Sequence, residues 1–116
     1  MQVLFESRDP EAMSLRDFAE KRVRFSMRRL TWLVPRAKVK LVDVNGPGGG
    51  VDKRCQIEFQ TDGNGTVVIT AMARDWRLAL DNALARAARS LVRVVQRSRG
   101  AGRTRITSRL ADAPQA

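Results

Sequence analysis

Residues 54–73 read RCQIEFQTDGNGTVVITAMA, two alternating segments joined by a short polar turn. Apolar and polar side chains alternate in both segments, which is typical of strands that bury one face. The inward positions are Cys55, Ile57, Phe59, Val67, Ile69 and Ala71. Asp-Gly-Asn-Gly stands between them at 62–65, and glycine and asparagine tolerate the positive φ of a tight hairpin turn. The sequence therefore predicts a β-hairpin with strands at 54–61 and 66–73.

Upstream of the hairpin, the pattern predicts two more strands and a helix. Residues 2–6 and 37–44 alternate like the hairpin strands, and a glycine-rich loop at 45–50 follows the second of them. The predicted helix is capped by Ser14, with Asp17 as in a capping box, and it ends before Pro35. Its apolar face consists of Leu15, Phe18, Ala19, Val23, Met27 and Leu30, and its opposite face of Asp17, Lys21, Arg24 and Arg28. This helix is therefore amphipathic, with a basic outer surface.

Downstream of the hairpin, Asp75 caps a second predicted helix, which runs to about Arg97. Its apolar face is formed by Leu80, Ala83, Leu84, Ala87, Leu91, Val94 and Val95. Beside that face, four arginines at spacings of three and four form one stripe: Arg86, Arg89, Arg93 and Arg97. After Ser98 the chain becomes rich in Gly, Ser, Thr and Arg without a period, so residues 100–116 are predicted to be a disordered basic tail.

The elements follow in the order β-α-β-β-β-α, which predicts an α+β fold. We expect a two-layer sandwich, with a four-stranded sheet that carries both helices on one face and exposes the other to water. A chain of 116 residues usually forms one domain. Residues 1–99 are therefore assigned to the domain and residues 100–116 to the tail.

The charge balance points to a polyanionic partner. Lys and Arg number 22 against 12 Asp and Glu, a formal net charge of +10 that favours nucleic acid or an anionic membrane surface. No apolar run approaches the ~18–20 residues that span a bilayer. The N-terminus alternates and carries Glu6 and Asp9 early, unlike a secretory signal. We therefore expect a cytoplasmic protein.

The composition argues against catalysis. The chain has no His and no Tyr, so it lacks the commonest general base and the commonest zinc ligand, and its carboxylates are scattered. Cys55 is the only cysteine, and its inward strand position predicts a buried thiol rather than a nucleophile. The loop at 45–50 lacks the Gly-Lys-Ser/Thr ending of a P-loop. We expect no enzymatic activity, no metal and no cofactor.

The two basic helix surfaces are the main candidate for function. If the helices pack side by side, their outward cations share one surface that could follow two phosphate backbones, as in shape recognition of double-stranded RNA. The candidate residues are Lys21, Arg22, Arg24, Arg28, Arg29, Arg86, Arg89, Arg93 and Arg97. The plainer interpretation is that these charges keep two exposed helices soluble. Binding is favoured because Asp81 is the only acid between Arg77 and Arg109.

The two tryptophans are weaker candidates. Trp32 and Trp76 stand near helix ends, where an aromatic ring can stack on a base. More often, a tryptophan in such a position closes the edge of a core. We therefore assign both to the core.

Two segments resemble a known family. Residues 75–81, DWRLALD, followed by the spaced arginines, are similar to the strand-to-helix junction of the ribosome hibernation promoting factor and ribosome-associated inhibitor family. Residues 43–55, DVNGPGGGVDKRC, are similar to a loop in one branch of that family. With Leu15-Arg16 opening the first helix, the resemblance covers roughly residues 2–98. Arg77 stands where the family often has Tyr, and Gly48 where it often has Arg.

The resemblance implies the β-α-β-β-β-α fold and a function. Members of the family bind the small ribosomal subunit, block the channel for mRNA and tRNA, and inhibit translation in resting or stressed cells. The rRNA contacts would fall to Arg22, Arg24, Arg28, Arg86, Arg89, Arg93 and Arg97. The chain would be a short form without the C-terminal domain that pairs two ribosomes, monomeric when free, with no membrane or small-molecule partner. Whether it promotes or prevents ribosome dimerisation stays open.

Two alternatives remain beside ribosome binding. The element order is also that of a double-stranded RNA-binding domain with an extra N-terminal strand, which would bind any A-form duplex equally. A transcription-modulating protein-interaction domain would instead form a complex that survives nuclease and high salt.

Overall fold

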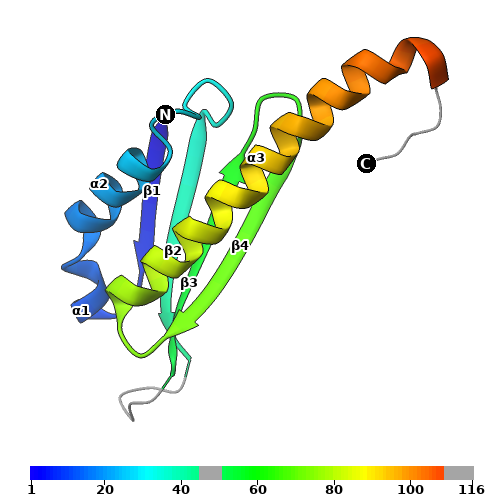
Figure 1. Cartoon of the computed structure of the whole chain (residues 1–116). Helices are drawn as coiled ribbons and strands as arrows, with labels where there is room; N and C mark the ends of the chain where they lie inside the picture. The colour runs from blue at the N-terminus through cyan, green and yellow to red at the C-terminus, as the bar shows by residue number, and fades with distance from the viewer. Residues whose placement is uncertain (45–50, 109–116) are drawn as a thin grey trace.

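The computed structural model describes residues 1–44 and 51–108, with side chains described up to residue 97. It contains the predicted order of strands, with the first helical segment split in two (Figure 1). The elements are β1 (Gln2–Ser7), α1 (Pro10–Met13), α2 (Arg16–Ser26), β2 (Arg36–Asp43), β3 (Lys53–Gln60), β4 (Thr66–Ala73) and α3 (Trp76–Ser108). The predicted glycine-rich loop at 45–50 lies outside the described residues.

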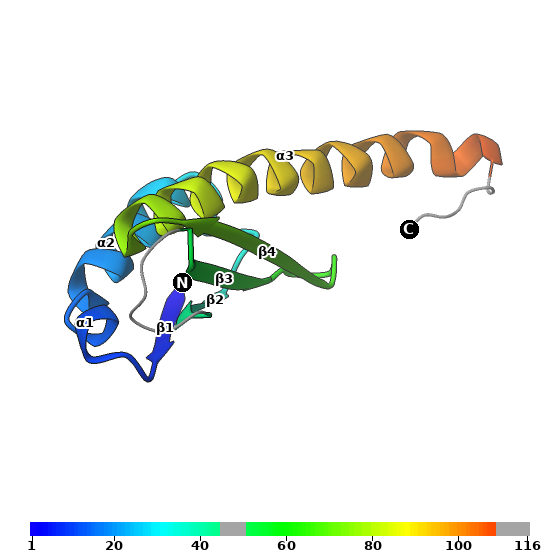
Figure 2. The same ribbon diagram turned by 90° about the horizontal axis from the view of Figure 1, so that it is seen from below.

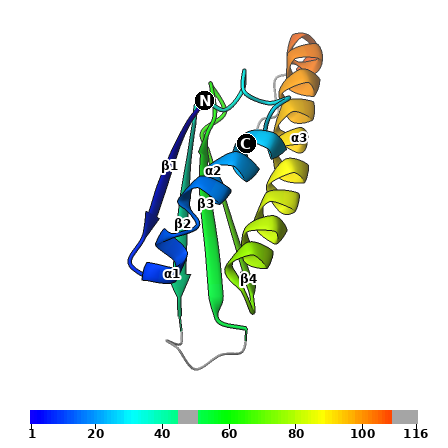
Figure 3. The same ribbon diagram turned by 90° about the vertical axis from the view of Figure 1, so that its left-hand side faces the viewer.

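The four strands form one sheet in the order β1-β2-β3-β4. The β1 strand pairs in parallel with β2, and α1 and α2 lie in the crossover that such a pair requires. The other neighbours are antiparallel, and Ile57 lies opposite Val39 on one side and Ile69 on the other. The helices cover one face of the sheet (Figures 2 and 3). The predicted α+β sandwich with both main helices on one face is therefore confirmed.

The core lies between this face and the helices. Phe59 and Ile57 on β3 and Leu80 and Leu91 on α3 are all at most 1% exposed. All six inward positions predicted for the hairpin belong to the core or pack against it. The hairpin turn is also as predicted, with Gly63 and Gly65 at φ of 85° and 77°. Among the described residues, no helix combines the length and apolar character needed to cross a bilayer.

The start of the first helical segment differs from the prediction. Ser14 does not cap a helix; it ends α1, which Asp9 caps by accepting from the backbone N–H groups of Glu11 and Ala12 at 2.9 and 3.4 Å. A helix start at Asp9-Pro10 prevails over the predicted start at Ser14, because proline at the first helical position has a preset φ and aspartate is a strong N-cap. The α2 helix then begins at Arg16, and Leu15 at its N-cap position offers no side-chain hydrogen bond.

The last helix is longer than predicted. Asp75 does cap α3, since its Oδ1 accepts from the Leu78 N–H at 2.8 Å. The helix continues past Arg97 to Ser108 and projects beyond the sheet (Figure 1). The expectation of disorder from residue 100 rested on the missing apolar period, whereas the helical backbone continues to Ser108, since a helix that is already formed extends more easily than a new one starts. Residues 109–116 lie outside the described residues, and the division of the chain at residue 99 stays a prediction.

A buried ion cluster joins the ends of β2 and β3 to the start of α3. Lys53 Nζ lies 3.0 Å from Asp43 Oδ2 and 3.0 Å from Asp52 Oδ1, and Asp52 is fully buried. The same ammonium lies 5.5 Å from the centroid of the Trp76 ring. The hydrogen bonds that Lys53 donates to Asp43 and Asp52 raise its pKa, so Lys53 keeps its positive charge throughout the neutral range.

We expect Phe59→Ala to lower the free energy of unfolding by about 3–5 kcal/mol, because it leaves a cavity among fully buried side chains. Gln60→Ala, the neighbouring exposed position, should change it by less than about 0.5 kcal/mol. Urea unfolding followed by circular dichroism measures both. Equal losses in the two variants would contradict the assignment of β3 to the centre of the core.

Candidate nucleic-acid interface

Contacts between α2 and α3 close the seam between the two helices. Asp81 on α3 accepts two hydrogen bonds from the Arg22 guanidinium on α2, from Nη2 at 2.6 Å and Nε at 3.0 Å. The guanidinium carbons of Arg22 and Arg77 lie 5.7 and 4.6 Å from the centroid of the Phe18 ring. Asp81 is the only acid between Arg77 and Arg109, and it is paired with Arg22, one of the candidate cations.

The arginine stripe of α3 lies on the other side of that helix. Arg86 donates through Nη1 to the backbone carbonyl of Thr70 on β4. Arg93 and Arg97 line a hollow of about 350 Å³ together with residues 67–69 of β4. Arg89 and Arg93 line a second, shallower hollow with Ala88 and Val92. The four residues form one stripe, as predicted, and it flanks the free edge of β4.

The α2 helix ends at Ser26, earlier than predicted, so Arg28 and Arg29 lie in the turn that follows it. The cations of α2 and of this turn have mixed surroundings. Arg24 is paired with Glu20 at 3.1 Å and donates to the Met1 carbonyl at 2.7 Å. Arg28 stacks on Phe25, whose ring centroid is 4.1 Å from its guanidinium carbon. Lys21 and Arg29 are exposed, and in residues 1–44 and 51–97 neither has an ion-pair partner.

The structure does not bring the two sets of cations face to face. Asp81 and Arg77 contact α2, whereas Arg86 reaches β4, so the stripe and the α2 cations lie on opposite sides of α3. The two basic sets therefore do not form the single surface that was expected. The layer made by α2 and α3, called the helical layer below, instead carries cations on both flanks of α3. Arg22 and Arg24 are paired with carboxylates. Among the described side chains, seven candidates have no ion pair: Lys21, Arg28, Arg29, Arg86, Arg89, Arg93 and Arg97. Two of them donate to backbone carbonyls, Arg86 to Thr70 and Arg28 to Phe25.

The tryptophans have different environments. Trp76 is 4% exposed, and its Nε1 donates to Glu11 Oε1 at 3.0 Å, which confirms that it closes the core. Trp32 is 62% exposed, so its assignment to the core was wrong. Its Nε1 donates to the Arg29 carbonyl at 3.1 Å, which holds the ring on the surface beside that arginine. Trp32 is therefore the ring that a base could reach.

Sequence reasoning missed Arg77, which it treated only as a departure from a family pattern. Its contact with Phe18 helps to close the seam between α2 and α3. A signal was present, because Arg77 and Asp81 are four residues apart and so lie on the same side of a helix.

Cys55 is buried, as predicted. Burial raises the pKa of its thiol to about 12, so it carries no thiolate at neutral pH and is a poor nucleophile. Among the described residues, no group of three or more Cys, Asp or Glu side chains is arranged to hold a metal ion.

The Cys55 thiol should make the protein less stable in alkali. Its pKa is raised in the folded state, so between the usual value of 9.0 and about 12 only the unfolded chain loses the proton. Unfolding free energy should therefore fall above pH 9, with a slope of at most about 1.4 kcal/mol per pH unit from this group. Urea unfolding from pH 8 to pH 10.5 measures the slope.

Cys55→Ala is the control, since it removes the titrating group. It should make the decline between pH 9 and pH 10.5 shallower, although the variant is less stable at neutral pH. An unchanged slope would show that Cys55 is not responsible. The raised pKa of Lys53 also lowers the unfolding free energy in alkali, but only above the usual lysine pKa of 10.5.

No protein-family model and no curated protein matches the sequence. Among solved structures, the N-terminal domain of Protein Y from Thermus thermophilus is similar to this chain, with a TM-score of 0.60 and 24% sequence identity. The match covers 80% of this chain and 98% of that one. The chain therefore has the fold of the Protein Y N-terminal domain, in agreement with the fold that its sequence resemblance implied.

Proposed function

We propose that this protein binds the small ribosomal subunit through rRNA, in the channel for mRNA and tRNA, and inhibits translation in resting or stressed cells. The observation that carries the proposal is the likeness in fold to Protein Y, a ribosome-associated factor, over almost all of its N-terminal domain. The sequence resemblance to the ribosome hibernation family and the net charge of +10 point the same way. On this proposal the protein acts in the cytoplasm, as a monomer and without catalysis.

The helical layer is the surface that we assign to rRNA. Its unpaired arginines present planar donor groups, which suit phosphate oxygens, and they line both flanks of α3. Cations on two flanks of one helix can contact two backbone segments, with α3 seated between them. Folded RNA offers such paired backbones, and it is recognised largely through shape and phosphate contacts.

The test is binding to purified small subunits at several salt concentrations. Arg89→Gln/Arg93→Gln removes two unpaired cations of the stripe, and should weaken binding and lower the slope of log affinity against log salt by about two. Lys21→Gln/Arg28→Gln tests the cations of α2 and of the turn after it in the same way. Sedimentation of subunits with labelled protein measures affinity, and translation of a reporter mRNA measures inhibition.

The matched control is Arg36→Gln/Lys38→Gln, which removes two cations from the opposite, open face of the sheet. It should retain most of the affinity, because those residues do not belong to the helical layer. Equal losses in all three variants would indicate attraction by net charge alone. Equal affinity for any RNA duplex would favour a general double-stranded RNA-binding module. A complex that withstands nuclease and high salt would favour the protein-interaction alternative.

A further inference from the structure

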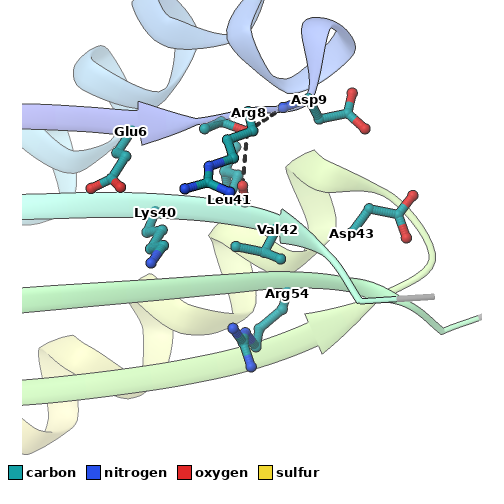
Figure 4. A pocket seen from close by; sticks show the side chains of 9 residues that line it. Glu6, Arg8, Asp9, Lys40, Leu41, Val42, Asp43 and Arg54 are labelled. Atoms are coloured by element: carbon teal, nitrogen blue, oxygen red, sulfur yellow. Dashed lines mark hydrogen bonds between the residues drawn. The ribbon is translucent and has the colours of Figure 1, made fainter. Parts of the chain in front are cut away.

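A hollow of about 650 Å³ lies on the open face of the sheet, away from the helical layer. It is lined by the ends of β1 and β2, the turn that leads to α1, and Arg54 of β3 (Figure 4). Its size is within the range of small-molecule sites, roughly 300–1,000 Å³. Three of its lining residues are cations: Arg8, Lys40 and Arg54.

The strand register gathers these cations around one apolar residue. Arg54 is directly opposite Val42, and Lys40 precedes Val42 by two residues on the same face of β2. Arg8 follows the last residue of β1, whose partner on β2 is Leu41. Val42 is half-buried and forms an apolar floor between the three charged groups.

Every acid that lines the hollow is already engaged. Glu6 is paired with Lys38 at 3.3 Å, and Asp43 with Lys53 at 3.0 Å. Asp9 accepts from two backbone N–H groups of α1. In contrast, Arg8, Lys40 and Arg54 have no ion-pair partner within residues 1–44 and 51–97. The hollow is therefore lined by three cations that have no ion pair of their own and can pair with an added anion.

The backbone that carries Arg8 is held in place. Ser7 Oγ donates to the Leu41 carbonyl at 2.8 Å and accepts from the Asp9 N–H at 3.2 Å (Figure 4). The residues on both sides of Arg8 are thus anchored, and Lys40 and Arg54 lie on paired strands. The backbone from which the three cations extend is therefore ordered before a ligand binds.

We propose that this hollow is a binding site for a small, multiply phosphorylated ligand, separate from the surface assigned to rRNA. Two guanidinium groups and an ammonium can neutralise a pyrophosphate-like group, and Arg offers it paired donors. The three cations without an ion pair all line one hollow of about 650 Å³, a volume in the range of small-molecule sites. A compact ligand therefore fits better than an RNA strand.

The test uses the full-length protein labelled with ¹⁵N and titrated with sodium pyrophosphate, ATP and a short single-stranded RNA. Pyrophosphate and ATP should bind saturably and shift the amide signals of Arg8, Val42 and Arg54 first. Tighter binding of ATP than of pyrophosphate would identify a nucleotide as the source of the phosphate. Shifts that begin on α3, or the absence of saturation, would overturn the proposal, as would RNA binding in the hollow in preference to both small ligands.

A charge-matched pair of variants separates this site from the attraction of a basic protein for any anion. Lys40→Gln/Arg54→Gln should weaken pyrophosphate binding by about tenfold or more, because it removes two charged donors. Arg36→Gln/Arg74→Gln removes the same charge at two exposed positions that do not line the hollow, and should change binding by less than about twofold. Equal weakening in both variants would contradict a defined site. The mapping on the unaltered protein stands even if a variant fails to fold.

Discussion

Burial of one face of α3 against the sheet fixes where the other groups of the helical layer lie. Ala79, Ala83 and Ala87 are fully buried at intervals of four residues, so the helix backbone can approach the sheet closely. Leu80 and Leu91 fill the space beside them. With this face fixed, a turn of about 100° per residue directs Arg77 and Asp81 towards α2 and Arg86 towards β4. The apolar contact therefore decides which cations meet an acid and which remain available.

The hairpin and its register could be predicted from the sequence because they depend on local patterns. Alternation assigns Ile57 and Phe59 to the buried face, and a turn with two glycines at positive φ fixes the pairing of Gln60 with Thr66. The cap of α3 by Asp75 is equally local. Such signals involve residues within a few positions of one another, so one sequence contains all the information needed.

The relation between the two basic sets could not be predicted in this way. A helical period shows which side chains share a face of one helix, but not how that helix is rotated against its neighbour. The rotation of α3 places Arg86 at β4 and removes it from Arg24 and Lys21. The split between α1 and α2 was missed for a different reason. Two capping signals, at Asp9 and Ser14, compete, and the pattern alone does not show which one prevails.

The distribution of acids is as informative as the excess of bases. A net charge of +10 attracts any polyanion from a distance, whereas local contacts depend on cations that are not already paired. Exposed pairs such as Arg22–Asp81 contribute at most about 1 kcal/mol to stability. Their larger effect is that a cation paired with an acid is no longer available to bind a phosphate. On both faces of the sheet the pairing is selective: Arg22 and Lys38 are engaged, and their neighbours Lys21 and Lys40 are not.

The two faces should therefore act independently. Val42 faces the open side of β2 and Leu41 the core, so the closest covalent link between the faces runs through a strand paired on both sides. Coupling between separate sites requires an element with two arrangements that both ligands bias differently. A strand held by ladders on both edges and by a close-packed core resists such a change. Substitutions on the open face and on the helical layer should then have additive effects on the free energy of ligand binding, since the substituted residues share no partner.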